Sequence, residues 1–386
     1  MKAPLRIAIV AGEDSGDQLG FKLMQALRAA TNARVVFSGI GGEAMEAEGL
    51  KSLFPLSEIA VMGILPVLAR LPGLLARIRQ TADAIVAAPP DGLVIIDSPD
   101  FTHRVARRVR AALPRLPVVD YVSPSVWAWR PGRAKAMRAY VDCVLALLPF
   151  EPAAHRRLGG PRCVYVGHPL IERLDELRPN AEEAARREAS PPLILALPGS
   201  RRSVIARLMA DFGGAIAILA HELGPLDVVL PTLPHVREEV AAWAADWPVK
   251  ARIVTGEGQK FAAFRTARAA LAASGTVTLE LALAGVPLVG AYKVSRLEEQ
   301  LKYLINVPSI LLPNLILGDN SIPEFLQREC TPENLGASLT GLTRAGIARN
   351  SQIQALARLD DLMRLPEGDS PSERAARIVM ETVAAR

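Results

Sequence analysis

The sequence is poor in cysteine and in aromatic side chains, and it has no long apolar run. Its 386 residues include only three cysteines, Cys143, Cys163 and Cys330, which lie far apart and lack metal-ligand spacing. A reduced compartment is the simplest interpretation of that usage. No apolar stretch reaches the length that spans a bilayer. We therefore expect a protein that is soluble or that lies on a membrane surface.

Several chemical signatures are also missing. The five histidines show no ligand spacing, and no Ser/His/Asp order indicates a hydrolase. The turn after the first apolar run, "AGEDSGDQLG", is not the G-x-G-x-x-G of dinucleotide-binding proteins. That first run, "IAIVA", is too short for a secretion signal and predicts a strand. The sequence therefore predicts no metal and no cofactor.

The charge balance is mildly basic. Lysine and arginine number 45 against 40 acidic residues, which gives a formal net charge of +5. Such a balance suits an anionic partner such as a nucleotide, a phosphate ester or an anionic membrane face. The basic residues are spread along the chain rather than concentrated, which disfavours a nucleic-acid binder.

Short β-rich apolar runs alternate with helical segments, which is typical of doubly wound α/β domains. At this length two domains are expected. We predict a first Rossmann-like domain over 1–170, a charged linker over 171–192 and a second Rossmann-like domain over 193–346. Helices over 347–386 can pack on either domain, the N-terminal one included. Two such domains in tandem would face an interdomain cleft and bind ligands at the carboxyl ends of their strands.

Two acidic motifs follow strands of the first domain. In "DGLVIIDSPDF", Asp97 ends a buried strand and Asp100 follows three residues later. A carboxylate there can act as a general base on a hydroxyl nucleophile, whereas capping of the next turn is the alternative. In "GEDSGDQLG", Ser15 and Asp17 either meet a polar ligand or cap the following helix.

The second domain has matching loops. Arg201 in "LPGSRRSVI" is placed to meet a phosphate before a helix. In "ASGTVTLELALAGVP", Ser274, Gly275 and Thr276 can donate to a diphosphate, and Glu280 can accept from both hydroxyls of a ribose. An exposed Glu280 on a capped helix is the alternative. Asn314 stands in an apolar frame, either for a ligand or as a core amide.

Two further stretches carry open alternatives. "YVSPSVWAWRPGRAKAM" combines Trp127 and Trp129 with Arg130 and Arg133, and aromatics beside such a basic cluster can stack nucleobases, anchor a membrane rim, line a buried cleft or simply pack. The segment 58–80 is either core helix or an interfacial segment, although its Pro66, Pro72 and Gly73 argue against a long regular helix. Its candidate membrane or acyl contacts are Val61, Met62, Ile64, Leu65, Val67 and Leu68.

These motifs together resemble the lipid-A-disaccharide synthase family. The matching stretches, in order along most of the chain, are "AGEDSGDQLG", "AVMGILPVL", "IIDSPDF", "YVSPSVWAWRPGR", "LALLPFE", "LPGSRRSVI", "ASGTVTLELALAGVPLVGAY" and "LPNLILGDNSIPEFLQ". The resemblance implies a GT-B glycosyltransferase that inverts the anomeric configuration and needs no metal. It also implies transfer of 2,3-diacylglucosamine from its UDP conjugate to 2,3-diacylglucosamine 1-phosphate, which forms a β(1→6) disaccharide 1-phosphate and UDP.

The same resemblance assigns roles to residues and a place to the protein. Asp97 would deprotonate the acceptor 6-hydroxyl. The UDP moiety would be held by Arg201, Ser274, Gly275, Thr276, Glu280 and Asn314. Acceptor contacts would involve Ser15, Asp17, Asp100, Trp127, Trp129, Arg130 and Arg133. The enzyme would be cytoplasmic and peripheral on the anionic inner face of the inner membrane. The sequence leaves its oligomeric state open, a homo-oligomer included. The alternatives are another UDP-sugar transferase or epimerase, and a non-enzymatic nucleotide- or membrane-binding module.

Overall fold

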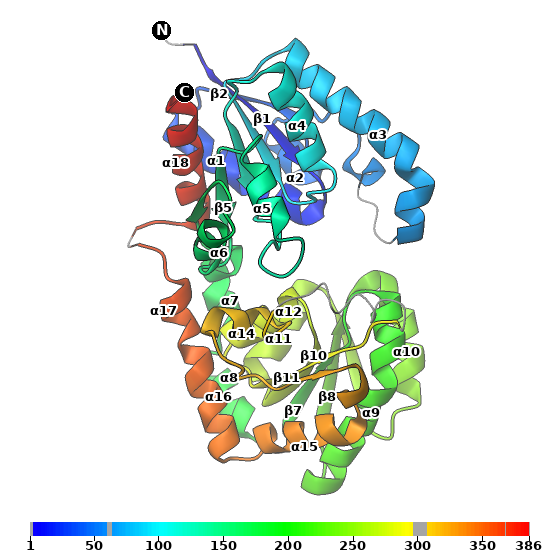
Figure 1. The fold of residues 1–386 in the computed structure, drawn as a ribbon. Helices are drawn as coiled ribbons and strands as arrows, with labels where there is room; N and C mark the ends of the chain where they lie inside the picture. The colour runs from blue at the N-terminus through cyan, green and yellow to red at the C-terminus, as the bar shows by residue number, and fades with distance from the viewer. Residues whose placement is uncertain (1–2, 60–63, 296–306, 367, 386) are drawn as a thin grey trace. The chain divides into compact units, whose positions relative to one another are not determined.

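The chain divides into two α/β units, each built on its own parallel sheet (Figure 1). The computed structural model describes residues 3–59, 64–295, 307–366 and 368–385, without the side chains of residues 64–69. Unit 1 comprises Met1–Pro169 and Leu365–Arg386, and unit 2 comprises Leu170–Arg364. The expected architecture of two doubly wound Rossmann-like domains is confirmed.

The sheet of unit 1 has six parallel strands in the order β2-β1-β3-β4-β5-β6. They are β1 (Leu5–Ala11), β2 (Val35–Ile40), β3 (Gly92–Ile96), β4 (Val118–Tyr121), β5 (Cys143–Ala146) and β6 (Arg162–Tyr165). The strand order reverses between β1 and β3, which pair directly with each other. In open α/β sheets a ligand binds beside the carboxyl ends of the two strands at such a switch point. The loops after β1 and β3 are therefore where a site is expected in unit 1.

Helices cover both faces of this sheet because alternate strand residues are apolar on each side. On one face α1 (Asp14–Ala30) and α18 (Pro371–Ala384) pack beside each other on the core around Ile7 and Ile9. On the other face α3 (Ile64–Ala87) and α4 (Thr102–Ala112) cover Ala8 and Val10. Shorter helices are α2 (Glu43–Ala47), α5 (Gly132–Met137) and α6 (Glu151–Arg157). The last helix of the chain thus belongs to the first unit.

The prediction that proline would prevent a long helix in segment 58–80 was wrong. Helix α3 runs through 24 residues, with Pro72 inside it. Pro66 lies in the first turn, where backbone N–H groups have no partner within the helix, so its missing N–H costs little. Pro72 removes a single hydrogen bond from the ladder. The apolar side chains of the second half compensate, because Ile78, Ala82 and Ile85 are buried against the sheet.

Unit 2 carries a second six-stranded parallel sheet, in the order β12-β11-β10-β7-β8-β9. Its strands are β7 (Leu193–Leu197), β8 (Asp227–Thr232), β9 (Ala251–Thr255), β10 (Ala269–Ala273), β11 (Leu288–Tyr292) and β12 (Glu324–Leu326). Here the order reverses between β7 and β10, which also pair directly. The loops after these two strands define the second switch point.

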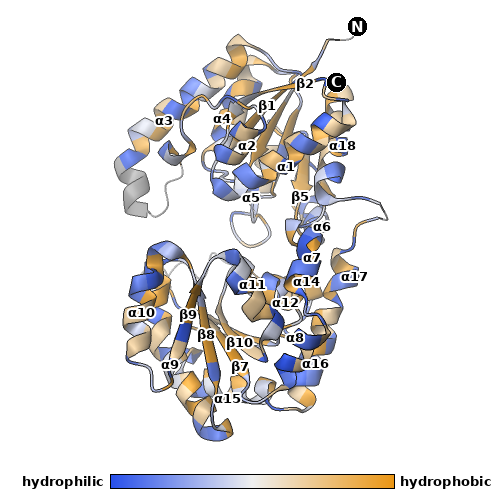
Figure 2. Cartoon of the chain, turned by 180° about the vertical axis from the view of Figure 1, so that it is seen from behind, coloured by the Kyte–Doolittle hydropathy of each residue, from blue (hydrophilic) through white to orange (hydrophobic). Residues whose placement is uncertain are grey.

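The helices of unit 2 complete its two faces. They are α7 (Leu174–Leu177), α8 (Ala181–Glu188), α9 (Arg202–Leu223), α10 (Arg237–Ala245), α11 (Glu257–Thr266), α12 (Thr276–Leu283), α14 (Leu312–Leu317), α15 (Pro332–Thr343), α16 (Ile347–Ala357) and α17 (Leu359–Met363). Helices α9 and α15 pack together on one face of the sheet. Figure 2 shows most strands of both sheets in hydrophobic colours, as expected for strands covered on both sides.

Residues 171–192 form part of unit 2 rather than the linker that their charge indicated. They contribute α7 and α8, and both pack on α11. Arg187 fixes α8 in place, because its guanidinium donates to the carbonyls of Phe264, Arg265, Ala284 and Gly285. Those carbonyls lie at the ends of α11 and α12, where helices leave acceptors unpaired. The charges of this segment therefore serve packing within the unit.

One helix in the described part of the chain, α9, is long and apolar enough to cross a membrane by length and composition alone. Half of its most apolar stretch is buried inside unit 2. Phe212 and Ile216 of α9 are fully buried in the core that α9 shares with α15. Its apolar character is thus that of a core helix.

Candidate functional site

Asp97 lies at the switch point of unit 1, directly after β3. Its φ is +53° and that of Ser98 is +43°, a left-handed conformation that non-glycine residues rarely adopt. The hydroxyl of Thr102 holds the turn by donating to the Asp97 carbonyl at 2.6 Å. Backbone strain of this kind persists where the surrounding structure enforces it, and it is common at functional sites. The turn presents a partly exposed Asp97 side chain at the carboxyl edge of the sheet.

The neighbouring strand end brings a second carboxyl group to Asp97. Glu13 is the N-cap residue of α1, immediately after β1, and its side chain is hydrogen-bonded to Asp97. Burial, the hydrogen bond to Asp97 and the charge of Asp97 together raise the pKa of Glu13 to about 7, and burial contributes most. The hydroxyl of Ser15 donates to Asp97 Oδ2 at 3.4 Å. Asp97 is therefore one member of a carboxyl pair, and Ser15, a candidate acceptor contact, lies beside it.

The close approach of these two loops depends on Gly12. A Cβ atom at position 12 would lie 2.2 Å from the Cβ of Ser98 and 2.6 Å from its hydroxyl oxygen. Real side chains do not tolerate such distances. The glycine therefore allows the loop after β1 to lie against the loop after β3, which brings Glu13 to Asp97.

A polar cluster at the surface joins the other candidates of unit 1. Asp100 is largely exposed and accepts a hydrogen bond from Arg133 at 3.1 Å. The guanidinium of Arg130 lies 3.9 Å from the same carboxylate and 4.1 Å from the ring centroid of Trp129. Trp129 itself is 40% exposed, which leaves its ring available to a ligand. These four residues thus form one accessible group of an indole, two cations and an acid.

Trp127 has a different environment from Trp129. Its indole N–H donates to Glu151 at 3.1 Å, and its ring packs edge-on against Phe150 with centroids 5.2 Å apart. Glu151 also accepts from the backbone N–H of Leu148 at 3.0 Å. Burial raises the pKa of Glu151 to about 7. The structure therefore favours the packing alternative for Trp127, which anchors the loop that carries Trp129.

Asp17 is a structural cap rather than an open ligand contact. It is 5% exposed, and its carboxylate accepts hydrogen bonds from the N–H groups of Gly42, Ala44 and Met45 at 2.7 to 3.1 Å. These donors open α2, where a carboxylate also interacts favourably with the helix dipole. The expectation that Asp17 binds the acceptor is corrected accordingly. Its partners stand far along the chain and give no local signal.

At the switch point of unit 2 the structure forms a cavity of about 510 Å³. This volume lies within the usual range for small-molecule sites. Its walls come from the loops and helices that follow β7, β8, β9 and β10. The lining residues are Leu197, Gly199, Ser200, Pro231, Thr232, Leu233, Pro234, Gly256, Glu257, Lys260, Ala273, Ser274, Gly275, Thr276, Val277 and Glu280. Four of the residues predicted to hold a nucleotide therefore lie in one cavity.

The loop after β10 opens α12 at the wall of this cavity. Gly275 is the N-cap residue with a φ of +156°, a conformation that favours glycine, and Thr276 begins the helix. The first turn of α12 contains no acidic residue, so its positive dipole end is not neutralised there. Ser274 donates its hydroxyl to the carbonyl of Ile310 at 2.8 Å, which fixes the loop. This arrangement suits an anionic group of a ligand.

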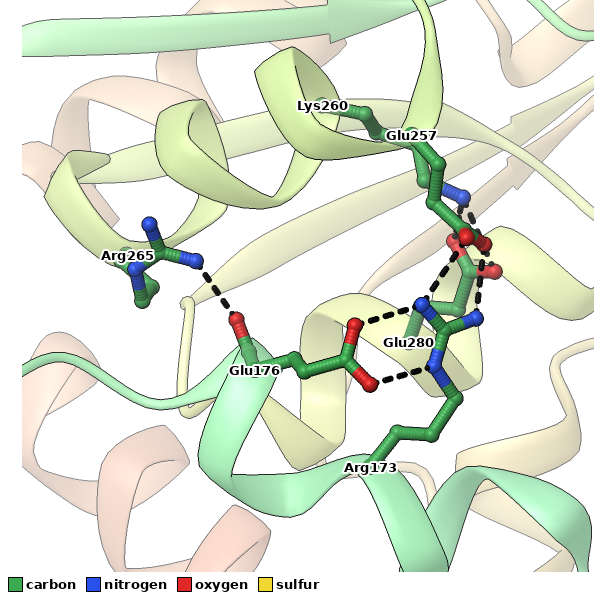
Figure 3. A network of polar contacts seen from close by, with 6 residues as sticks. All are labelled: Arg173, Glu176, Glu257, Lys260, Arg265 and Glu280. Atoms are coloured by element: carbon green, nitrogen blue, oxygen red, sulfur yellow. Dashed lines mark hydrogen bonds and ion pairs between the residues drawn. The ribbon is translucent and has the colours of Figure 1, made fainter.

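Glu280 lies one turn into α12 and is held by a cation that the sequence motif does not contain. The ammonium of Lys260, from α11, donates to Glu280 Oε1 at 3.1 Å and to Oε2 at 2.9 Å (Figure 3). Glu280 is partly buried, not exposed. The alternative of a freely exposed acid on a capped helix does not describe it.

The two remaining nucleotide candidates lie outside the cavity lining. Arg201 is the exposed N-cap residue of α9, next to Ser200, which does line the cavity. Asn314 is 2% exposed, and its amide bonds the backbone of Ile322 in both directions and donates to Ser309 at 3.3 Å. The expectation of direct ligand contact by Asn314 is corrected, because its polar atoms serve the core-amide alternative. Asn314 supports the loop 309–311, on which Ser274 rests.

The candidate membrane segment is only partly visible. Val61 and Met62 lie outside the described residues. Ile64, Leu65, Val67 and Leu68 belong to α3, but their side chains lie outside the described part. Among the described arginines of this segment, Arg77 pairs with Glu58 and lies 4.7 Å from the ring centroid of Phe54. In the described ranges no group of three or more His, Cys, Asp or Glu side chains is arranged to hold a metal ion.

Comparison with known sequences decides the family. The sequence profile described as lipid-A-disaccharide synthetase matches residues 7–368. The chain belongs to the lipid-A-disaccharide synthase family. A lipid-A-disaccharide synthase of Nitrobacter hamburgensis is 58% identical over 379 residues, covering 98% of this chain and 96% of the relative. One from Rhodospirillum centenum is 44% identical over 388 residues, covering 99% and 96%.

Solved structures of other proteins share the fold of this lipid-A-disaccharide synthase family member. MurG of Acinetobacter baumannii superposes with a TM-score of 0.62 at 16% identity, covering 98% of this chain and 100% of that one. A UDP-GlcNAc 2-epimerase of Neisseria meningitidis, solved with UDP-GlcNAc bound, gives a TM-score of 0.61 at 12% identity and covers 99% and 100%. At these identities the likeness establishes the fold alone. The chain is a glycosyltransferase of GT-B type by family and fold together.

Two residues of this family member's candidate site were missed in the sequence. Glu13 was visible only as an acid beside a turn, and its position after β1 at the switch point was the available signal. Lys260 gave no signal, because only the fold brings its ammonium, on α11, to Glu280 on α12.

Proposed function

We propose that this chain transfers 2,3-diacylglucosamine from UDP-2,3-diacylglucosamine to the 6-hydroxyl of 2,3-diacylglucosamine 1-phosphate. The products are a β(1→6) tetraacyl disaccharide 1-phosphate and UDP. The observation that carries the proposal is the chemical contrast between the two switch points. Unit 1 offers a carboxyl pair, Glu13 and Asp97, whereas unit 2 offers a cavity at a helix N-terminus. A transferase of this kind needs a base and a site that stabilises an anionic leaving group.

The cavity of unit 2 is proposed to hold the UDP of the donor. Ser274, Gly275 and Thr276 would face the diphosphate, because anions favour a helix N-terminus with unpaired N–H groups. Glu280 would accept hydrogen bonds from the ribose hydroxyls. Arg201, exposed beside the cavity, would add a positive charge to the leaving group.

Asp97 is proposed as the general base. Its carboxylate would take the proton of the acceptor 6-hydroxyl while that oxygen attacks the anomeric carbon of the donor. The bond between the anomeric carbon and the diphosphate oxygen would break, and its electron pair would leave with UDP. Attack opposite to the leaving group inverts the anomeric carbon, which gives the β linkage. The positive end of α12 and Arg201 would stabilise the charge that develops on the diphosphate.

The acceptor is proposed to bind in unit 1 near Ser15 and the surface cluster of Trp129, Arg130, Arg133 and Asp100. The cluster supports this role because both arginines share a single exposed carboxylate, which a phosphate could replace as their partner. The apolar start of α3 is proposed to contact acyl chains at the anionic inner face of the inner membrane. Sedimentation of the protein with anionic and with neutral phospholipid vesicles tests the proposed membrane contact.

The substrate class is tested by release of UDP from purified protein. The reaction is run with UDP-2,3-diacylglucosamine and the lipid acceptor, with either alone, and with unacylated UDP-GlcNAc. We expect UDP release only with the complete acylated pair. Conversion of UDP-GlcNAc without any acceptor would instead favour an epimerase, and release from UDP-GlcNAc with a non-lipid acceptor another UDP-sugar transferase.

A further inference from the structure

We propose that Lys260 is a positioning residue for the nucleotide cavity, which sets the preference for a ribose over a deoxyribose by holding Glu280. The inference rests on the proposed function, in which Glu280 binds the ribose. It adds a residue from a different helix, whose position is set by the fold and not by the motif that contains Glu280.

The geometry of the pair is that of a cation bound to both oxygens of one carboxylate. Lys260 Nζ lies 3.1 Å from Oε1 and 2.9 Å from Oε2 of Glu280. The two side chains are 25% and 14% exposed, and both residues line the cavity. Contact with both oxygens fixes the rotation of the carboxylate, which is otherwise a soft torsion in a glutamate.

Lys260 is directed to Glu280 because its nearer acidic neighbour is already occupied. Glu257 lies one turn before Lys260 on α11 and is a natural partner at that spacing. Both oxygens of Glu257 accept instead from Arg173, at 2.8 Å each, and Arg173 also binds Glu176 (Figure 3). The hydrogen bonds of Arg173 lower the pKa of Glu257. Because Arg173 pairs with Glu257, Lys260 pairs with Glu280 instead.

Aromatic rings limit where the Lys260 ammonium can lie. Its Nζ is 4.8 Å from the ring centroid of Phe261 and 5.9 Å from that of Phe264. Both phenylalanines are buried, so their rings are fixed by packing. The attraction between a cation and an aromatic ring favours this place for the ammonium. The position of the Glu280 carboxylate is thus set by the core through Lys260.

The arrangement leaves Glu280 able to bind a diol. An ionised carboxylate offers about four acceptor positions, and the ammonium uses two of them. The remaining two suit the adjacent hydroxyls of a ribose, provided that the carboxylate keeps one orientation. A ligand that lacks the 2′-hydroxyl leaves one position unpaired, which is the basis of selectivity at such sites. Without Lys260 the Glu280 carboxylate can rotate, so removal of the 2′-hydroxyl from the ligand should lower the affinity by a smaller factor.

The test compares UDP with 2′-deoxy-UDP as probes on the full chain. Affinities for both are measured by calorimetry for the wild-type protein, Lys260→Met, Glu280→Gln and the double variant. Lys293→Met is the matched control, because Lys293 pairs with Asp211 at 2.6 Å with side chains 25% and 16% exposed, and neither lines the cavity. Donor KM and kcat are measured in parallel.

We expect Lys260→Met to reduce the preference for UDP over 2′-deoxy-UDP by roughly three- to tenfold, the worth of about one hydrogen bond. The double variant should show little further loss beyond Glu280→Gln, since both changes remove one interaction. Donor KM should rise with kcat nearly unchanged, as for a contact made equally before and during reaction. Lys293→Met should leave the preference unchanged.

Two results would overturn the inference. If Lys260→Met weakens UDP and 2′-deoxy-UDP equally, Lys260 contacts the diphosphate directly or acts only on folding. If the preference is unchanged, Lys260 does not position Glu280. Both results presuppose that the wild-type protein binds UDP. Failure of the wild-type protein to bind UDP would instead contradict the proposed function itself.

Discussion

Glu13 and Asp97 are hydrogen-bonded through their carboxyl groups, and the pKa of Glu13 is raised to about 7 by its burial, by that hydrogen bond and by the charge of Asp97. Below that value Glu13 carries a proton that it can donate to Asp97. That hydrogen bond occupies a carboxylate oxygen of Asp97, which is then less available to another donor. In the proposed mechanism the pair therefore links the role of Asp97 as base to the proton on Glu13 near neutral pH.

The first prediction concerns the pH dependence of the reaction. We expect kcat/KM to rise with pH through an apparent pKa of about 7, because loss of the Glu13 proton frees the Asp97 carboxylate. Glu13→Gln keeps a hydrogen-bond donor beside Asp97 but cannot titrate. The rising limb near pH 7 should therefore disappear in that variant, and rates from pH 5 to 9 test this.

The same carboxyl pair affects stability with a defined sign. The pKa of Glu13 in the folded protein lies above its ordinary value of 4.5. Between about 4.5 and 7 the folded state holds a proton that the unfolded state has lost, so this contribution to stability falls as pH rises.

For the first prediction, a pH profile of kcat/KM that is the same in Glu13→Gln as in the wild-type protein would count against the coupling of the pair.

The second prediction concerns the contact between the loops after β1 and β3. Gly12→Ala places a Cβ 2.2 Å from the Cβ of Ser98, so it should destabilise unit 1 by roughly 1–3 kcal/mol, the usual cost of overpacking. Ser98→Gly removes the opposing atoms and relaxes a φ of +43°, and should itself change stability by less than about 1 kcal/mol. The double variant should regain most of the lost stability in urea unfolding.

The rescue is the informative part of that design. A Gly12→Ala protein that remains as destabilised after Ser98→Gly would show that the two loops do not meet as described. Neither change alters the Asp97 side chain, so activity of the double variant reports whether the loop positions are restored.

The third prediction concerns Glu151, which accepts hydrogen bonds from Trp127 and from the N–H of Leu148. Glu151→Ala leaves these two donors without their partner and should cost about 2–4 kcal/mol. Burial raises the pKa of Glu151 to about 7, so its contribution to stability also falls as pH rises from about 4.5 to 7. Glu151→Gln should reduce that slope relative to the wild-type protein.

Urea unfolding at pH 5 and at pH 7.5, followed by tryptophan fluorescence, measures both effects. Glu13→Gln is a useful comparison, because the contribution of Glu13 to stability falls in the same pH window. The slopes of unfolding free energy against pH that the two glutamates contribute should therefore add. If the free energy of unfolding changes with pH as steeply in Glu151→Gln as in the wild-type protein, Glu151 of the wild-type protein keeps its charge in the folded state throughout that range.

The main elements of the fold could be predicted from the sequence because their signals are local. Continuous apolar runs such as "DGLVIID" indicated strands buried on both faces, and β3 is one of them. The strands β6 and β12 were missed, since they are edge strands that are only partly buried and therefore lack a continuous apolar run. The charge of residues 171–192 indicated a linker, because a sequence does not reveal that Arg187 binds carbonyls at two helix ends.

The candidate site was predicted in part for the same reason. Asp97 and Glu280 stand at strand ends and helix starts, positions that the sequence pattern gives directly. Asp17 and Asn314 are polar residues in similar settings, yet their partners at Gly42 and Ile322 bury them as structural groups. Residue type and spacing alone do not distinguish a buried cap from a ligand contact. Glu13 and Lys260 acquire their importance only from distant partners.

The central claim is that Asp97 is the base of a glycosyl transfer whose donor is held by unit 2. The most direct measurement compares Asp97→Asn with the wild-type protein in UDP affinity and in turnover of the acylated pair. We predict unchanged UDP affinity and a turnover reduced by about 10²- to 10⁴-fold, the usual contribution of a general base. Turnover near the wild-type rate would contradict the account.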